Sequence, residues 1–67
     1  MLSNQLRHLR YKHNELSQES LAQAVGVSRQ TIYAIEKGKF NPSVKLALEL
    51  ARFFDVSVHD IFSLEES

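Results

Sequence analysis

The stretch from position 29 to 37 carries four side chains that form hydrogen bonds or ion pairs, namely Arg29, Gln30, Tyr33 and Lys37. At about 100° per residue, Gln30, Tyr33 and Lys37 fall on one side of a helix, with the arginine on its flank. Ile32 and Ile35 fall on the other side and define an inward face. A short helix anchored by two isoleucines, with guanidinium, amide, phenol and ammonium groups outward, is suited to a polar partner.

A second short helical pattern precedes this one and positions it. Ser17 and Ser28 each stand before a pattern, where a serine hydroxyl caps a helix. An apolar residue before each serine, with another four helical positions in, has the spacing of a hydrophobic staple. Gly26 stands where the first helix must end, and the left-handed position there favours glycine. We expect a larger residue at this position to strain the turn.

These two patterns have the spacing of a helix-turn-helix. Ala22 is small where the second helix crosses the first, and Gly26 sits in the turn. Together with residues 36–38 (Glu-Lys-Gly) and 41–43 (Asn-Pro-Ser), the stretch resembles the DNA-binding domain of the Cro and phage-repressor family of prokaryotic regulators. The resemblance continues to Phe62. It implies an all-α, five-helix, lambda-repressor-like domain, which we expect to cover residues 1–67.

The resemblance implies that the second helix enters the major groove of DNA. Arg29, Gln30 and Tyr33 are then the expected groove contacts, because arginine can donate two hydrogen bonds to guanine and glutamine can pair with adenine. Ala34 stands where relatives often carry a longer side chain, so readout is expected early in the helix. Phosphate contacts are expected from Gln18, Ser28, Thr31, Lys37, Lys39 and Asn41.

Packing competes with binding at three of these positions. Ser28 has a capping role of its own, Thr31 lies near the inward edge, and Tyr33 can pack across the surface with its hydroxyl in water. For these residues the two interpretations stay open.

Charge distribution bears on the nature of the partner. The chain has eight Lys or Arg and eight Asp or Glu, and this neutrality argues against nucleic acid. Residues 1–45, however, hold seven Lys or Arg against three Glu, a balance of +4, and residues 46–67 hold one Arg against five acids, a balance of −4. A basic half can face phosphates, whereas an ordinary solvated surface is the alternative.

Other function classes have little support in the sequence. The chain has no cysteine, and His8, His13 and His59 lie in no metal-ligand or nucleophile motif, so we expect no enzyme, no metal and no cofactor. Without a leader or an apolar run of roughly 20 residues, we expect a cytoplasmic protein. The rival to double-stranded DNA as a partner is protein, in an adaptor or antitoxin-like module. A further regulatory protein is an open partner in either case.

The first helix is expected over residues 1–13, with Leu2, Leu6 and Leu9 inward. A small sheet that pairs residues 1–3 with 63–65 is the alternative for the termini. The resemblance also implies a pair between Arg10 and Glu36, although the connection before Leu16 is one residue longer than usual.

Two more helices complete the expected fold. Ser43 can cap a fourth helix from Val44 to about Phe54, whose wide apolar band marks it as the central packing helix. The band consists of Val44, Ala47, Leu48, Leu50, Ala51 and Phe54. Ser57 and Asp60 have the spacing of a capping box for a short fifth helix that ends near Phe62.

A homodimer is expected for two reasons. A chain of this size buries a marginal core, and one recognition helix reaches only a few base pairs. The resemblance therefore implies a repressor that binds a palindromic operator as a dimer. The interface is expected from Phe53, Val58, Phe62 and Leu64, with completion of the monomer core as the alternative role of these residues.

Overall fold

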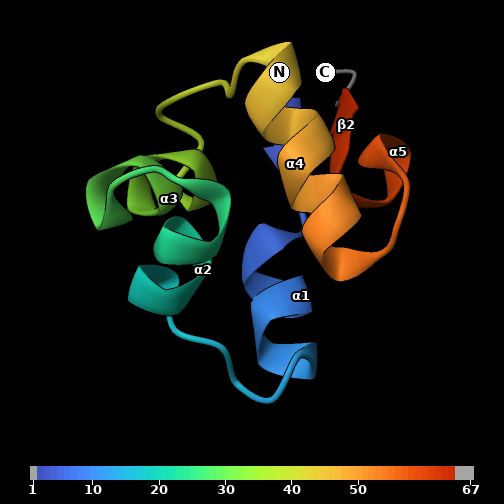
Figure 1. Ribbon diagram of the computed structural model, residues 1–67. Helices are drawn as coiled ribbons and strands as arrows, with labels where there is room; N and C mark the ends of the chain where they lie inside the picture. The colour runs from blue at the N-terminus through green and yellow to red at the C-terminus, as the bar shows by residue number, and fades with distance from the viewer. Residues whose placement is uncertain (1, 65–67) are drawn as a thin grey trace.

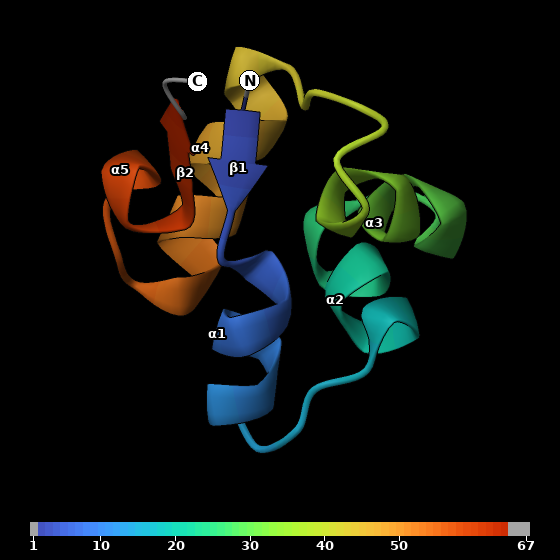
Figure 2. The same cartoon turned by 180° about the vertical axis from the view of Figure 1, so that it is seen from behind.

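The computed structural model describes residues 2–64, and these form five helices and a two-stranded sheet (Figure 1). In chain order the elements are β1 (Leu2–Asn4), α1 (Leu6–Lys12), α2 (Gln18–Val25), α3 (Arg29–Glu36), α4 (Val44–Phe54), α5 (Val58–Ile61) and β2 (Phe62–Leu64). Helices α2 and α3 lie on one side of α4, and α5 with the sheet lies on the other (Figures 1 and 2). The expected five-helix fold is confirmed.

Each of the last four helices begins at a serine that caps it. The hydroxyls of Ser17, Ser28, Ser43 and Ser57 each accept a hydrogen bond from the backbone N–H three residues on, at 3.0 to 3.3 Å. Asp60 completes the expected capping box by accepting from the Ser57 N–H at 3.0 Å. A serine cap of this kind stabilises a helix by about 1 kcal/mol. The starts of α2 to α5 are therefore fixed by local chemistry, as the sequence indicates.

The expected start of the first helix is wrong. Residues 2–4 form β1, which runs antiparallel to β2 with Leu2 opposite Leu64 and Asn4 opposite Phe62. The helix begins only at Leu6, because the side chain of Asn4 accepts from the Leu6 N–H at 3.1 Å and the Gln5 N–H donates to Ile61 at 2.8 Å. The alternative of a terminal sheet is correct, but its pairing lies further in than 1–3 with 63–65. Met1 and Glu65 are outside the described residues.

One core joins all five helices. Its buried side chains are Leu6, Leu21, Ala22, Val25, Ile32, Ile35, Leu46, Leu50, Ala51, Ile61 and Phe62. Helix α4 supplies Leu46, Leu50 and Ala51, which confirms its central position. Its apolar band is narrower than expected, since Val44 is 78% exposed and Leu48 is 55% exposed.

The two connections around α2 use the left-handed region of the backbone. Gly26 ends α2 with φ +75°, as expected, yet a Cβ there would have no neighbour within 4 Å. Strain in a substituted turn would therefore come from backbone conformation and not from crowding. Before α2, Asn14 and Glu15 adopt φ values of 55° and 54°. Both residues lie in the connection from α1, which the resemblance leads us to expect to be one residue longer than usual.

Candidate nucleic-acid interface

Helix α3 presents a polar outer face, and its apolar face is fully packed. Ile32 and Ile35 are buried, whereas Gln30 and Lys37 are exposed and Tyr33 is 44% exposed. Figure 1 places α3 at one edge of the molecule, on the side away from α5. Arg29 is exposed as well, and Ala34 is half-buried. The arrangement leaves the hydrogen-bonding groups near the start of α3 free to meet a ligand.

A part-buried ion pair fixes the end of α3 to α1. Arg10 donates from Nε and Nη2 to the two carboxylate oxygens of Glu36, at 2.6 and 3.0 Å, and from Nη1 to the Leu16 carbonyl at 2.8 Å. The two side chains are only 12% and 6% exposed. The hydrogen bond to Glu36 raises the pKa of Arg10 above its ordinary value, although burial opposes this. The expected pair of Arg10 and Glu36 is confirmed despite the longer connection.

The start of α2 joins the same network. Gln18 donates from Nε2 to Glu36 Oε1 at 3.1 Å, and this bond holds its side chain half-buried against the end of α3. Gln18 therefore has a structural partner in addition to its expected phosphate contact. One hydrogen of the amide remains free to donate elsewhere.

A polar hollow of about 330 Å³ opens beside this network, and we name it the α1–α3 hollow. Its lining from α1 is Arg7, Arg10 and Tyr11, and its lining from α2, α3 and the residue after α3 is Gln18, Arg29, Tyr33, Glu36 and Lys37. Four of the lining residues are cationic and one is acidic. The structure thus brings four predicted site residues, Gln18, Arg29, Tyr33 and Lys37, to one place.

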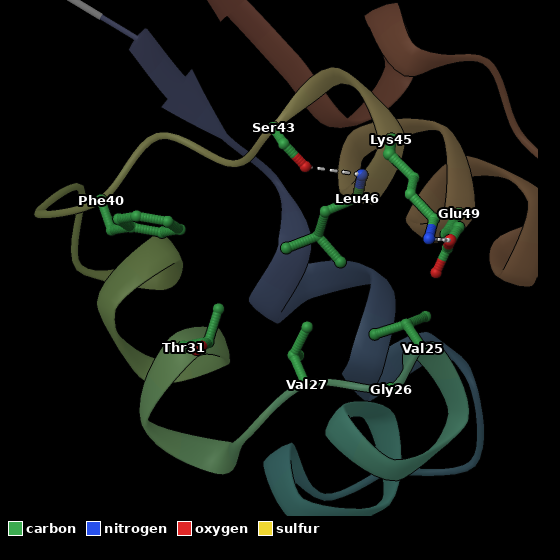
Figure 3. A pocket seen from close by; sticks show the side chains of 9 residues that line it. All are labelled: Val25, Gly26, Val27, Thr31, Phe40, Ser43, Lys45, Leu46 and Glu49. Atoms are coloured by element: carbon green, nitrogen blue, oxygen red, sulfur yellow. Dashed lines mark hydrogen bonds and ion pairs between the residues drawn. The ribbon is translucent and has the colours of Figure 1, made fainter.

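A second hollow lies on the opposite flank of α3, between the α2–α3 turn and the start of α4 (Figure 3). Its volume is about 340 Å³, and Phe40 and Thr31 stand on one side of it with Ser43 on the other. The hydroxyls of Ser28 and Thr31 form a hydrogen bond of 3.1 Å with each other. Both are therefore already engaged in the cap of α3.

The loop beside this second hollow carries the remaining predicted contacts. Lys39 and Asn41 are exposed on either side of Phe40. Gln18 lines the α1–α3 hollow, whereas Lys39 and Asn41 flank Phe40, which lines the second hollow, so the predicted phosphate ligands do not form one cluster. Two strands of a duplex could be contacted in this way.

Sequence reasoning missed the contribution of α1 to this surface. Arg7 and Tyr11 are exposed and line the α1–α3 hollow together with residues of α3. Their spacing of four residues places them on one face of α1, which was a usable signal. The sequence alone does not say which side of α1 faces α3. The Arg10–Glu36 pair in the structure gives this orientation.

The four expected interface residues have different environments. Phe62 is only 7% exposed and belongs to the monomer core, which is the alternative role expected for these residues. Phe53 is half-buried and packs against the rings of His13 and Phe54, with centroids 5.3 and 5.0 Å away. Val58 is half-buried, and Leu64 is 80% exposed.

Comparison with known proteins identifies the family. The model of the helix-turn-helix family matches residues 6–61. The chain belongs to the helix-turn-helix family of DNA-binding transcriptional regulators. The resemblance to the Cro and phage-repressor group is therefore confirmed, and the family is not a class of enzymes. In this regulator, no helix of the described part of the chain is long and apolar enough to cross a membrane.

Individual relatives of the helix-turn-helix regulator support the same assignment. An uncharacterized HTH-type transcriptional regulator of Methanocaldococcus jannaschii is 55% identical over 65 residues, which are 97% of each chain. The transcriptional repressor RstR of the cryptic phage CTXphi, from Vibrio cholerae, is 34% identical over 67 residues, which cover 100% of this chain and 60% of RstR. The crystal structure of the restriction-modification controller protein C.AhdI from Aeromonas hydrophila has a TM-score of 0.72 at 36% identity, covering 82% of each chain.

Proposed function

We propose that this regulator is a sequence-specific repressor that binds a palindromic operator as a homodimer and reads bases with α3. The observation that carries the proposal is the exposed polar face of α3 on a rigid support. Ile32 and Ile35 anchor the helix from behind, and Glu36 is locked to Arg10 at its end. RstR, which is similar to this chain, is named as a repressor. As a DNA-binding regulator, the protein is inferred to act in the cytoplasm.

Within this proposal the predicted residues divide into two roles. Arg29, Gln30 and Tyr33 project near the start of α3 and read base edges in the major groove. Backbone contacts position the helix and come from both of its flanks. The residues assigned to them are Gln18, Ser28, Thr31, Lys37, Lys39 and Asn41. Ser28 and Thr31 serve first as the cap of α3 and second as phosphate ligands.

The proposed dimer interface lies at the end of the molecule that carries the terminal sheet. Leu64 is 80% exposed there, and it lines an apolar hollow together with Leu2 and Val58. The first turn of α4 lies at the same end, and on α4 Val44 and Leu48 are exposed apolar residues (Figures 1 and 2). Apolar surface of this kind is typical of contacts between subunits.

The position of this surface suits binding of two subunits to one duplex. In both views α3 lies on one side of α4 and the sheet lies on the other, so a partner at the sheet end does not cover α3 (Figures 1 and 2). A two-fold partner at the sheet end leaves both α3 helices facing the same side. Such a dimer can place them in successive major grooves, about 34 Å apart.

Binding to duplex DNA at two salt concentrations tests the main proposal. We expect purified protein to bind a mixed-sequence duplex at low salt and to lose affinity steeply as salt rises, because phosphate contacts release counterions. Selection from random duplexes should then yield a palindromic site. A protein that ignores duplexes at low salt would contradict the proposal and favour the adaptor or antitoxin-like alternative.

The oligomeric state tests the interface. We expect Leu64→Glu and Val44→Glu to shift the protein from dimer to monomer in sedimentation while the helical circular dichroism is kept, since both side chains are exposed in the single chain. Ala24→Glu is the matched control, because it places the same charge on an exposed residue of α2. A wild-type monomer at micromolar concentration, or variants that stay dimeric, would contradict this interface.

A further inference from the structure

The α1–α3 hollow contains positive charges that no acidic side chain among residues 2–64 neutralises. Arg10 is neutralised by Glu36, but Arg7, Arg29 and Lys37 form no ion pair with any of residues 2–64. All three are exposed at the hollow, which has no other acid in its lining. The hollow therefore offers three uncompensated cations to an anion that enters it.

Arg7 is held in place by an aromatic neighbour. Its guanidinium lies 5.6 Å from the centroid of the Tyr11 ring, and the guanidinium of Arg10 lies 5.9 Å from the same ring. Cations at these distances are attracted by the face of a tyrosine. Since Arg10 is fixed by three hydrogen bonds to Glu36 and Leu16, the Tyr11 ring connects Arg7 to a rigid support.

Glu36 would repel an anion if it were free. Both of its oxygens instead accept hydrogen bonds from Arg10, and one accepts from Gln18 as well. The side chain is 6% exposed, so the carboxylate is withdrawn from the opening. The part of the lining that faces solvent is consequently cationic and aromatic.

We propose that the α1–α3 hollow binds a backbone phosphate of the DNA, with Arg7 of α1 as a direct ligand and Tyr11 as the residue that positions it. This inference rests on the proposed function, since it extends the DNA-binding surface from the helix-turn-helix to α1. The hollow adjoins Arg29 and Tyr33 on α3, so an α3 helix in the major groove brings the hollow to the strand that borders that groove. A guanidinium matches a phosphate better than any other side chain does.

The salt dependence of binding measures this contact directly. We expect Arg7→Gln to weaken binding to a 30-base-pair mixed-sequence duplex about fivefold at low salt. The slope of log affinity against log salt should fall by about 0.9, the value for one phosphate contact. Lys12→Gln is the matched control, because it removes the same charge from an exposed residue of α1 outside the hollow. It should leave the slope unchanged.

Two variants of Tyr11 separate positioning from packing. Tyr11→Phe keeps the ring and should bind with the wild-type slope, whereas Tyr11→Ala should lose part of the Arg7 contribution. In an Arg7→Gln background, Tyr11→Ala should cost nothing further. Thermal unfolding of every variant reports whether the fold is intact.

The outcomes distinguish this inference from the function on which it rests. If the wild-type protein does not bind the duplex, both the phosphate site and the proposed function are contradicted. If the wild-type protein binds and Arg7→Gln keeps its slope, or if Lys12→Gln lowers the slope equally, the phosphate site is overturned and the regulator proposal stands.

Discussion

The side chain of Asn4 donates a hydrogen bond from Nδ2 to the main-chain carbonyl of Ile35 over 2.9 Å. The same side chain accepts from the Leu6 N–H at 3.1 Å, and its backbone pairs with Phe62 in the sheet. Ile35 lies in the last turn of α3, and its carbonyl also accepts a hydrogen bond from the Gly38 N–H at 3.0 Å. One asparagine thus connects the sheet, the start of α1 and the end of α3.

We predict that Asn4→Ala lowers the free energy of unfolding by about 1 to 2 kcal/mol, because it removes two part-buried hydrogen bonds. Asn4→Asp should lose only the part of this stability that comes from the bond to Ile35, since its carboxylate can still cap α1 but cannot donate a hydrogen bond. Urea titration measures both changes. Wild-type stability of Asn4→Asp would show that the bond to α3 contributes nothing.

Removing one partner of the Arg10–Glu36 pair should strongly destabilise the fold, and removing both should destabilise it by less than the two single losses combined. We predict that Glu36→Gln and Arg10→Met each destabilise the protein by about 3 kcal/mol, since the partner charge is left with little solvent. The double variant should be more stable than the sum of the two losses predicts. Urea titration of all four proteins gives this coupling, and strict additivity would contradict a direct interaction.

Gln30 should determine sequence preference. Because it is exposed on the outer face of α3, we predict that Gln30→Ala costs about 1 to 3 kcal/mol on the selected operator and relaxes preference at one or two base pairs. Competition binding against operators with single changes measures the effect. An equal loss on every sequence would argue against base reading.

Lys37 should behave differently, because a phosphate contact carries no sequence information. We predict that Lys37→Ala weakens all duplexes alike and lowers the salt slope by about one. The Lys37 ammonium lies 5.7 Å from the centroid of the Tyr33 ring. Tyr33→Phe keeps the ring and this contact, so it serves as a control for Lys37→Ala. An unchanged slope in Lys37→Ala would remove the residue from the phosphate ligands.

Asp60 should make the cap of α5 sensitive to acid. Hydrogen bonds from the Ser57 N–H and then from the Ser57 hydroxyl lower the pKa of Asp60. A carboxyl group whose pKa is lower in the folded chain stabilises the fold above its unfolded value of about 3.9, and the contribution is lost as pH falls through the lowered pKa. We predict that Asp60→Asn unfolds at a lower temperature than wild type at pH 7, with a difference that vanishes on acidification. A gap that persists at the lowest pH would contradict this linkage.

Local features of the fold were predictable from the sequence. The serine caps and the left-handed Gly26 depend on residues within one or two turns, and all of them occur where expected. The strand at residues 2–4 was not separable from a helix, because it exists only through pairing with residues 62–64. Leu2 is compatible with the apolar pattern of a helix and with that of a strand.

Which apolar residues are exposed also depends on tertiary packing, so it could not be predicted from the sequence. Val44 and Leu48 continue the apolar band of α4 in sequence, but the helices packed around α4 cover only one of its faces. Phe62 shows the opposite case, since it completes the core where an interface was expected. The outer face of α3 could be predicted from helical periodicity alone. The side of α1 that lies beside α3 could not, because it is set by the contact of Arg10 with Glu36, which are 26 positions apart in sequence. The assigned DNA contacts themselves remain predictions.

The cationic lining of the α1–α3 hollow belongs to a chain whose formal net charge is zero. A duplex therefore exerts little overall pull on the distant molecule, but it exerts a torque that turns the basic side forward before contact. Repulsion between DNA and the acidic C-terminal half disfavours docking in the reverse orientation. Such a molecule should spend less time on irrelevant polyanions than a strongly basic regulator of equal size.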